Sequence, residues 1–189
     1  MHYLLRLFII ATALFGSWAS AQVVDRLFDD VNALSPTGWL GAVAAVDSAF
    51  VNVISDDDHE NVYAIAREYG NGRILVTAHE AILTSPGRMD NDQFVLNSLA
   101  WLGQSDNALV TVSTGHGESA RSSATNYLAD LGRSVDTIQS IYSFGLSTTD
   151  ILVIGNAGQA FLPSEIDTIE TFVANGGGLL RRLEDALKP

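Results

Sequence analysis

The chain of 189 residues contains no cysteine. Disulfides and thiol chemistry are therefore excluded, and a nucleophile would have to be a serine. Basic residues are also scarce, because 10 Lys and Arg stand against 22 Asp and Glu, for a formal net charge of −12. This acidic balance disfavours nucleic acid and anionic lipid surfaces as partners. The G-x-S-x-G elbow of serine hydrolases and the H-E-x-x-H zinc motif are missing as well.

The N-terminal segment has the layout of a secretory signal peptide. His2 and Arg6 precede an apolar run that ends in Ala19, Ser20 and Ala21. We expect residues 1–21 to be cleaved before Gln22, which predicts an exported protein, periplasmic or secreted. The alternative is an uncleaved N-terminal anchor, which would be the one route to a membrane.

The rest of the chain contains 47% apolar residues and is long enough for a packed core. Residues 22–104 form a β-rich half with consecutive, antiparallel strands. The expected elements of this half are a leading helix within Gln22 to Thr37, strands over Gly41 to Val46, Ala49 to Ile54, Val62 to Glu68 and Arg73 to Ala78, and a helix after Asp90.

Residues 105–189 alternate between strand and helix, which indicates parallel strands joined by crossover helices. The expected strands are Ala108 to Ser113, Val135 to Ile141 and Asp150 to Gly155, and the expected helices are Glu118 to Leu131 and Pro163 to Ala174. The fold class is thus α/β, a layered and mainly parallel sheet with flanking helices, preceded by short antiparallel strands.

The last strand begins at Leu179 and Leu180, but the charged residues Arg181, Arg182, Glu184 and Asp185 follow at once. Unpaired charges are costly to bury in a parallel sheet. We therefore expect that the strand stops early or that the tail turns helical, and that the sheet is truncated at its C-terminal end in either case. An open edge of this kind predicts marginal stability as a monomer or self-association.

His79 and Glu80 follow a strand, at the edge where ligands collect in open α/β sheets. A His oriented by an acid is the base half of a nucleophile triad, and Ser113 and Ser119 are the serines best placed to complete it. The competing interpretation is a polar pair that caps a strand. The acidic run from Asp56 to Glu60 does not follow a known calcium loop and is interpreted as a solvated turn, so no metal site is predicted.

Residues Gly115 to Ala120 fit the pattern G-x-G-x-x-A between a strand and a helix. Backbone amides there could cradle a phosphate. However, Glu118 places a carboxylate where the pyrophosphate would lie, so the favoured interpretation is a tight turn, and no cofactor is predicted.

Two segments, GNGRILVTAHEAIL and DNDQFVLNSLAWL, resemble the closing part of class I glutamine amidotransferase-like domains. With DILVIGNAGQAFLPSEIDTIETFVANGGGLL after them, the order of the chain is similar to the N-terminal region of enhancin-like, mucin-degrading metallopeptidases and of TRP-channel-associated factors. The amidotransferase cysteine and the peptidase H-E-x-x-H motif are absent.

The resemblance implies a flavodoxin-like topology and a non-catalytic accessory module that binds a glycan, cell-surface or protein partner. Its ligand contacts are expected from His79, Glu80, His116, Glu118, Asn156 and Gln159. The alternative is a serine-type hydrolase that uses His79 with Ser113 or Ser119. A third hypothesis is a fragment of a longer peptidase-associated protein.

Overall fold

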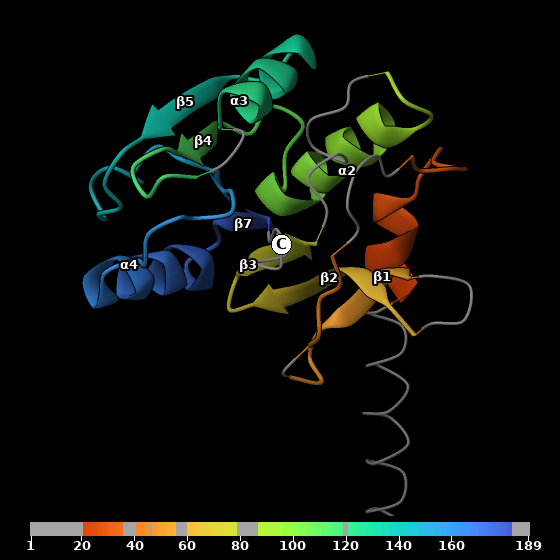
Figure 1. Ribbon diagram of the computed structural model, residues 1–189, viewed down its shortest axis with the longest axis horizontal. Coiled ribbons are helices and arrows are strands. Elements are labelled where there is room, and N and C mark those ends of the chain that lie inside the picture. The colour runs from red at the N-terminus through yellow and green to blue at the C-terminus, as the bar shows by residue number, and fades with distance from the viewer. Residues whose placement is uncertain are drawn as a thin grey trace, which may run out of the picture.

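The computed structural model describes residues 21–35, 41–45, 47–55, 60–78, 87–118 and 121–182. One seven-stranded sheet runs through these residues in the order β1-β2-β3-β7-β6-β4-β5 (Figure 1). Its strands are β1 (Val51–Ser55), β2 (Val62–Tyr69), β3 (Gly72–Thr77), β4 (Val110–Ser113), β5 (Val135–Ile138), β6 (Ile151–Ile154) and β7 (Gly178–Arg182). The pairs β1-β2 and β2-β3 are antiparallel, and the four other pairs are parallel. This arrangement confirms the predicted fold class.

The helices cover both faces of the sheet. They are α2 (Asn91–Gly103), α3 (Arg121–Asp130) and α4 (Pro163–Ala174), with a further helical segment at residues 21–27. The side chains of β6 alternate between the two faces, as those of a strand buried on both sides must. Ile151 and Val153 join the cluster built with α2 and α3, whereas Leu152 and Ile154 join the one that contains Ile169 of α4.

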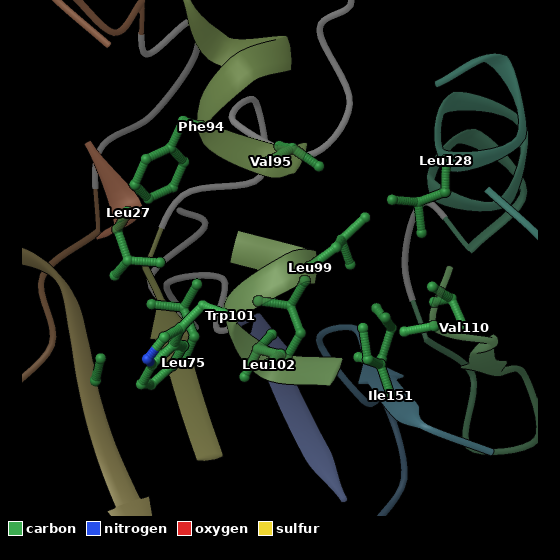
Figure 2. Packing of buried hydrophobic residues seen from close by; sticks show 14 of the residues in the cluster. Leu27, Leu75, Phe94, Val95, Leu99, Trp101, Leu102, Val110, Leu128 and Ile151 are labelled. Atoms are coloured by element: carbon green, nitrogen blue, oxygen red, sulfur yellow. The ribbon is translucent and has the colours of Figure 1, made fainter. Parts of the chain in front are cut away.

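Helix α2 is the centre of the larger core (Figure 2). Phe94, Val95, Leu99 and Leu102 recur at helical spacing and each is at most 1% exposed. Leu27 of the helical segment at residues 21–27 packs into the same cluster. The N-terminal segment is fastened further by Asp90, whose carboxylate accepts the backbone N–H groups of Asn32 at 2.7 Å and Ala33 at 3.0 Å.

The predicted strand at Gly41 to Val46 is wrong for the described residues 41–45, which are not in a strand. One hydrogen bond, 2.7 Å from Val43 N to Val62 O, joins this run to the end of β2. Both edges of β2 are already paired, with β1 and with β3, so the run at residues 41–45 cannot pair with β2 as a further strand. An apolar run is therefore not sufficient to predict a strand.

The prediction for the C-terminal strand is also wrong. Strand β7 extends to Arg182, which is 2% exposed, and it lies between β3 and β6 rather than at an edge. Arg181 is compensated there, since its guanidinium lies 5.5 Å from the centre of the Phe161 ring and in the field of Glu118. The outer strands are β1 and β5, so β7 leaves no open edge for self-association.

Strands β3, β6 and β4 end at one edge of this single sheet, as predicted, although β7 separates β3 from β6. No helix among the described residues is both long and apolar enough to cross a membrane.

Candidate functional site

Polar side chains gather at the carboxyl edge of the parallel strands. Ser113 is the last residue of β4, and residues 114–118 form the loop that leads from it toward α3. The loop after β6 lies next to this one, because the backbone N–H of Gln159 donates to His116 O at 3.0 Å. Carboxyl ends of parallel strands are where ligand sites form in such sheets.

Glu118 is the anchor of the loop. Its side chain is fully buried, and one carboxylate oxygen accepts the hydroxyl of Ser113 while the other accepts the backbone N–H of His116 at 2.8 Å. The carboxylate thus occupies the position in front of the loop amide that a phosphate would take in a glycine-rich anion site. An internal anion of this kind argues against dinucleotide binding.

Gly115 supports the tight-turn interpretation of this loop. A Cβ on this residue would lie 1.6 Å from the carbonyl oxygen of Gln139, so only glycine fits against the segment after β5. Gly117 has a φ of 67°, in the left-handed region that favours glycine.

His116 connects the loop to α4. Its Nε2 lies 2.9 Å from Glu165 Oε2. The His116 ring packs against the Phe161 ring, with 4.1 Å between the two ring centres. A carboxylate only accepts hydrogen bonds, which assigns the proton to Nε2. Nδ1 is buried without a hydrogen-bond partner and lies 3.8 Å from Glu118 Oε1.

Glu165 accepts hydrogen bonds from three segments. Besides His116, it takes the backbone N–H of Ile141 at 3.2 Å and that of Leu162 at 2.9 Å. Burial acts to raise the pKa of this carboxyl, but the hydrogen bonds outweigh it and hold the pKa below its ordinary value of 4.5. The charged form is therefore the stable one in the folded protein.

Sequence reasoning did not identify Glu165. The available signal was its position, since Pro163 opens the helix and a Glu at the third helical position commonly reaches back to the N-cap. The contact with His116, 49 residues earlier, has no signal in a single sequence.

The predicted site residues fall into three groups. Ser113, His116 and Glu118 are brought together, but all three are buried and bonded within the cluster. Asn156 is half-buried and Gln159 is exposed on the loop after β6. The remaining three, His79, Glu80 and Ser119, lie outside the described residues.

This geometry restricts the chemistry. The hydroxyl of Ser113 is 0% exposed and donates to a carboxylate, so it is not presented to a substrate. Within the described ranges, no group of three or more His, Asp or Glu side chains is arranged to hold a metal ion.

The fold and this cluster define a class of protein, a layered α/β domain. Among its described residues, the acids Glu118 and Glu165 at the carboxyl edge bind His116 rather than an open site. Residues 20–182 match the family described as TRPM8, N-terminal domain, and the chain belongs to that family.

The chain is similar to TRPM8 channel-associated factors over most of its length. It is 30% identical to factor 3 of Rattus norvegicus over 135 residues, which cover 71% of this chain and 13% of the relative. It is 27% identical to factor 2 of Homo sapiens over 160 residues, or 84% of this chain and 16% of the relative. The chain thus spans less than a fifth of the length of these relatives.

Solved structures share the fold. IMPa from Pseudomonas aeruginosa in complex with an O-glycopeptide superimposes with a TM-score of 0.77 at 17% identity, over 98% of this chain and 22% of that one. The IMPa metallopeptidase in complex with T-antigen gives a TM-score of 0.74 at 17% identity, over 96% of this chain and 21% of that one. The membership and the fold fit a non-catalytic accessory module.

Proposed function

We propose that the protein is a non-catalytic accessory module that binds a polypeptide partner, glycosylated or bare, at the carboxyl edge of its sheet. One observation carries the proposal. Among the described residues of this edge, the groups suited to acid, base or nucleophilic chemistry, Ser113, His116 and Glu118, are buried and hydrogen-bonded to one another or to Glu165. A catalytic group has to reach the reacting atoms, which these side chains do not.

The cluster has a different consequence, which is rigidity. It joins the loop after β4, the start of α4 and the segment at Ile141, and His116 O holds the loop that carries Gln159. An exposed amide on a rigid loop both donates and accepts hydrogen bonds, as peptide groups and sugar hydroxyls require. Pre-ordered loops bind with a smaller entropic loss.

The known relatives support a polypeptide partner. TRPM8 channel-associated factors are named for a protein partner, and one IMPa structure contains an O-glycopeptide. From the resemblance to class I glutamine amidotransferase-like domains, we also propose that the protein descends from that class. This chain lacks the nucleophilic cysteine of those domains.

Two measurements on the full chain test the proposal. A panel of ester, amide and glycoside substrates should show no turnover, and biosensor binding should be seen to an O-glycosylated peptide or to its unglycosylated match. The variant Gln159→Ala should weaken binding about fivefold, the size of a modest interface contact. Gln93→Ala, an exposed glutamine on α2, is the matched control and should leave binding unchanged.

Turnover that disappears in a folded Ser113→Ala variant would instead establish the hydrolase. Failure of both peptides to bind would remove the polypeptide from the proposal.

We also propose export, on the basis of the N-terminal layout described above. The mature protein should begin at Gln22, which intact-mass measurement after expression in a secreting host will show. A mass that includes Met1 would contradict cleavage.

A further inference from the structure

A pocket lies at the opposite edge of the sheet from the polar cluster. It has a volume of about 550 Å³, within the range of small-ligand sites. It is formed where β6 and β7 begin, beside the second half of α4 and the turn that follows Ile141. Its lining includes Ser143, Leu146, Asp150, Asp167, Thr171 and Phe172.

The charge of this pocket has one sign. Asp150 and Asp167 line it, and none of its described lining residues is a Lys, Arg or His. Both acids are exposed. The C-terminal end of α4, which has no basic residue in its last turn, adds the negative end of a helix dipole. The pocket is therefore electronegative and opposes the entry of anions.

Its wall combines acceptors with an aromatic surface. The Phe172 ring lies on the backbone of Gly177, where a Cβ would come within 2.3 Å of the ring. Leu146 adds apolar surface, and the hydroxyls of Ser143 and Thr171 are on exposed residues. Carboxylates beside an aromatic ring are the groups that recognise ammonium and guanidinium ions, by charge and by cation–π attraction.

We propose that this pocket binds a compact organic cation, a primary ammonium or guanidinium group on a short alkyl stem. The two acids neutralise the head, and Phe172 with Leu146 covers the stem. This site is independent of the carboxyl edge, because the two lie at opposite ends of the same strands. It therefore goes beyond the proposed function and does not depend on it.

NMR titration of the full chain with n-butylammonium tests the site. Binding with a dissociation constant on the order of 1 mM is expected for a ligand of this size. The shifted amides should include Asp167, Thr168 and Thr171. Butyrate and n-butanol are the probes of opposite and of no charge, and neither should bind comparably. Raising the salt concentration should weaken butylammonium binding.

Matched variants locate the charge that is responsible. Asp167→Asn should weaken binding about threefold to fivefold, the range of exposed ion pairs. Glu170→Gln makes the same charge change on the same helix outside the lining and should leave the affinity within about twofold. Asp150→Asn is the second variant, and it keeps the oxygen that accepts Leu109 N–H at 2.8 Å.

The source of the cation is a separate readout. A capped peptide with one lysine that binds at least tenfold more tightly than butylammonium, with its norleucine analogue inactive, assigns the site to a polypeptide side chain. Equal affinities assign it to a free amine. The proposal is overturned if butanol binds as well as butylammonium, if Asp167→Asn and Glu170→Gln behave alike, or if the shifts fall outside the pocket.

Discussion

Replacing Glu165 by alanine should destabilise the protein strongly. Glu165 is 6% exposed, and its carboxylate accepts hydrogen bonds from His116, Ile141 and Leu162. Alanine removes the acceptor of all three donors at once. The loop after β4, the segment after β5 and the first turn of α4 then lose their common contact.

The magnitude follows from the state of each donor after truncation. A buried donor left without an acceptor costs about 1–3 kcal/mol. Ile141 and His116 are buried, whereas the Leu162 residue is 62% exposed, so the loss of its hydrogen bond should cost less. The expected loss for Glu165→Ala is therefore about 2–6 kcal/mol, set mainly by two groups. That is a large part of a typical folding free energy of about 5–15 kcal/mol.

Urea denaturation followed by circular dichroism measures this loss, and a thermal melt should show a midpoint lower by about 10 °C for a chain of this size. Glu165→Gln keeps one acceptor oxygen and should lose about 1–2 kcal/mol. Glu170→Ala, on an exposed position of the same helix, is the control and should change stability by less than about 0.5 kcal/mol. A loss below about 1 kcal/mol for Glu165→Ala would refute the view that this carboxylate organises the edge.

Three further results are expected. Acid should destabilise the native protein as pH falls below 4.5, because the pKa of Glu165 is lower in the folded state than its ordinary value. The stabilisation is complete above pH 4.5 and is lost as the pH falls through the lower, folded pKa. In urea melts at a series of pH values, Glu165→Gln should therefore lose less stability with acid than the unchanged protein. Leu99→Ala should cost about 2–5 kcal/mol in the same assay, since the side chain is 1% exposed at the centre of the larger core, and a loss under about 1 kcal/mol would contradict that packing. Gly115→Ala should cost about 3 kcal/mol, because its Cβ would meet the Gln139 carbonyl, whereas Gly158→Ala, whose nearest atom is at 3.4 Å, should be close to neutral; equal losses would show that the Gly115 loop moves freely.

Local patterns predicted most of the individual elements. The hairpin between β2 and β3, helix α2 after Asp90, and helix α4 with Pro163 at its start all depend on residues near one another in the chain. Alternation of strand and helix in the second half predicted the parallel strands, because crossover connections demand it.

The place of β7 is a different kind of fact. Arg181 and Arg182 predicted a strand that stops at Leu180, because burying a charge without a partner is costly. In the folded chain, Phe161 and Glu118 approach Arg181 from separate loops, and β3 and β6 supply hydrogen-bonding edges on both sides. A penalty for burying charge depends on partners that only the tertiary structure assembles.

The candidate site divides in the same way. Sequence by itself determined that the chain lacks a thiol nucleophile, that it is acidic, and that His116 belongs to a loop at the end of a strand, since composition and local pattern suffice for these points. It placed Glu118 in the following helix, whereas the described helix α3 begins at Arg121. Only the tertiary structure decided that Glu165 meets His116, that Glu118 fills its own loop, and that an acidic pocket opens at the opposite edge. Those features depend on contacts between segments tens of residues apart, and a single sequence does not record which distant side chains will share a buried volume.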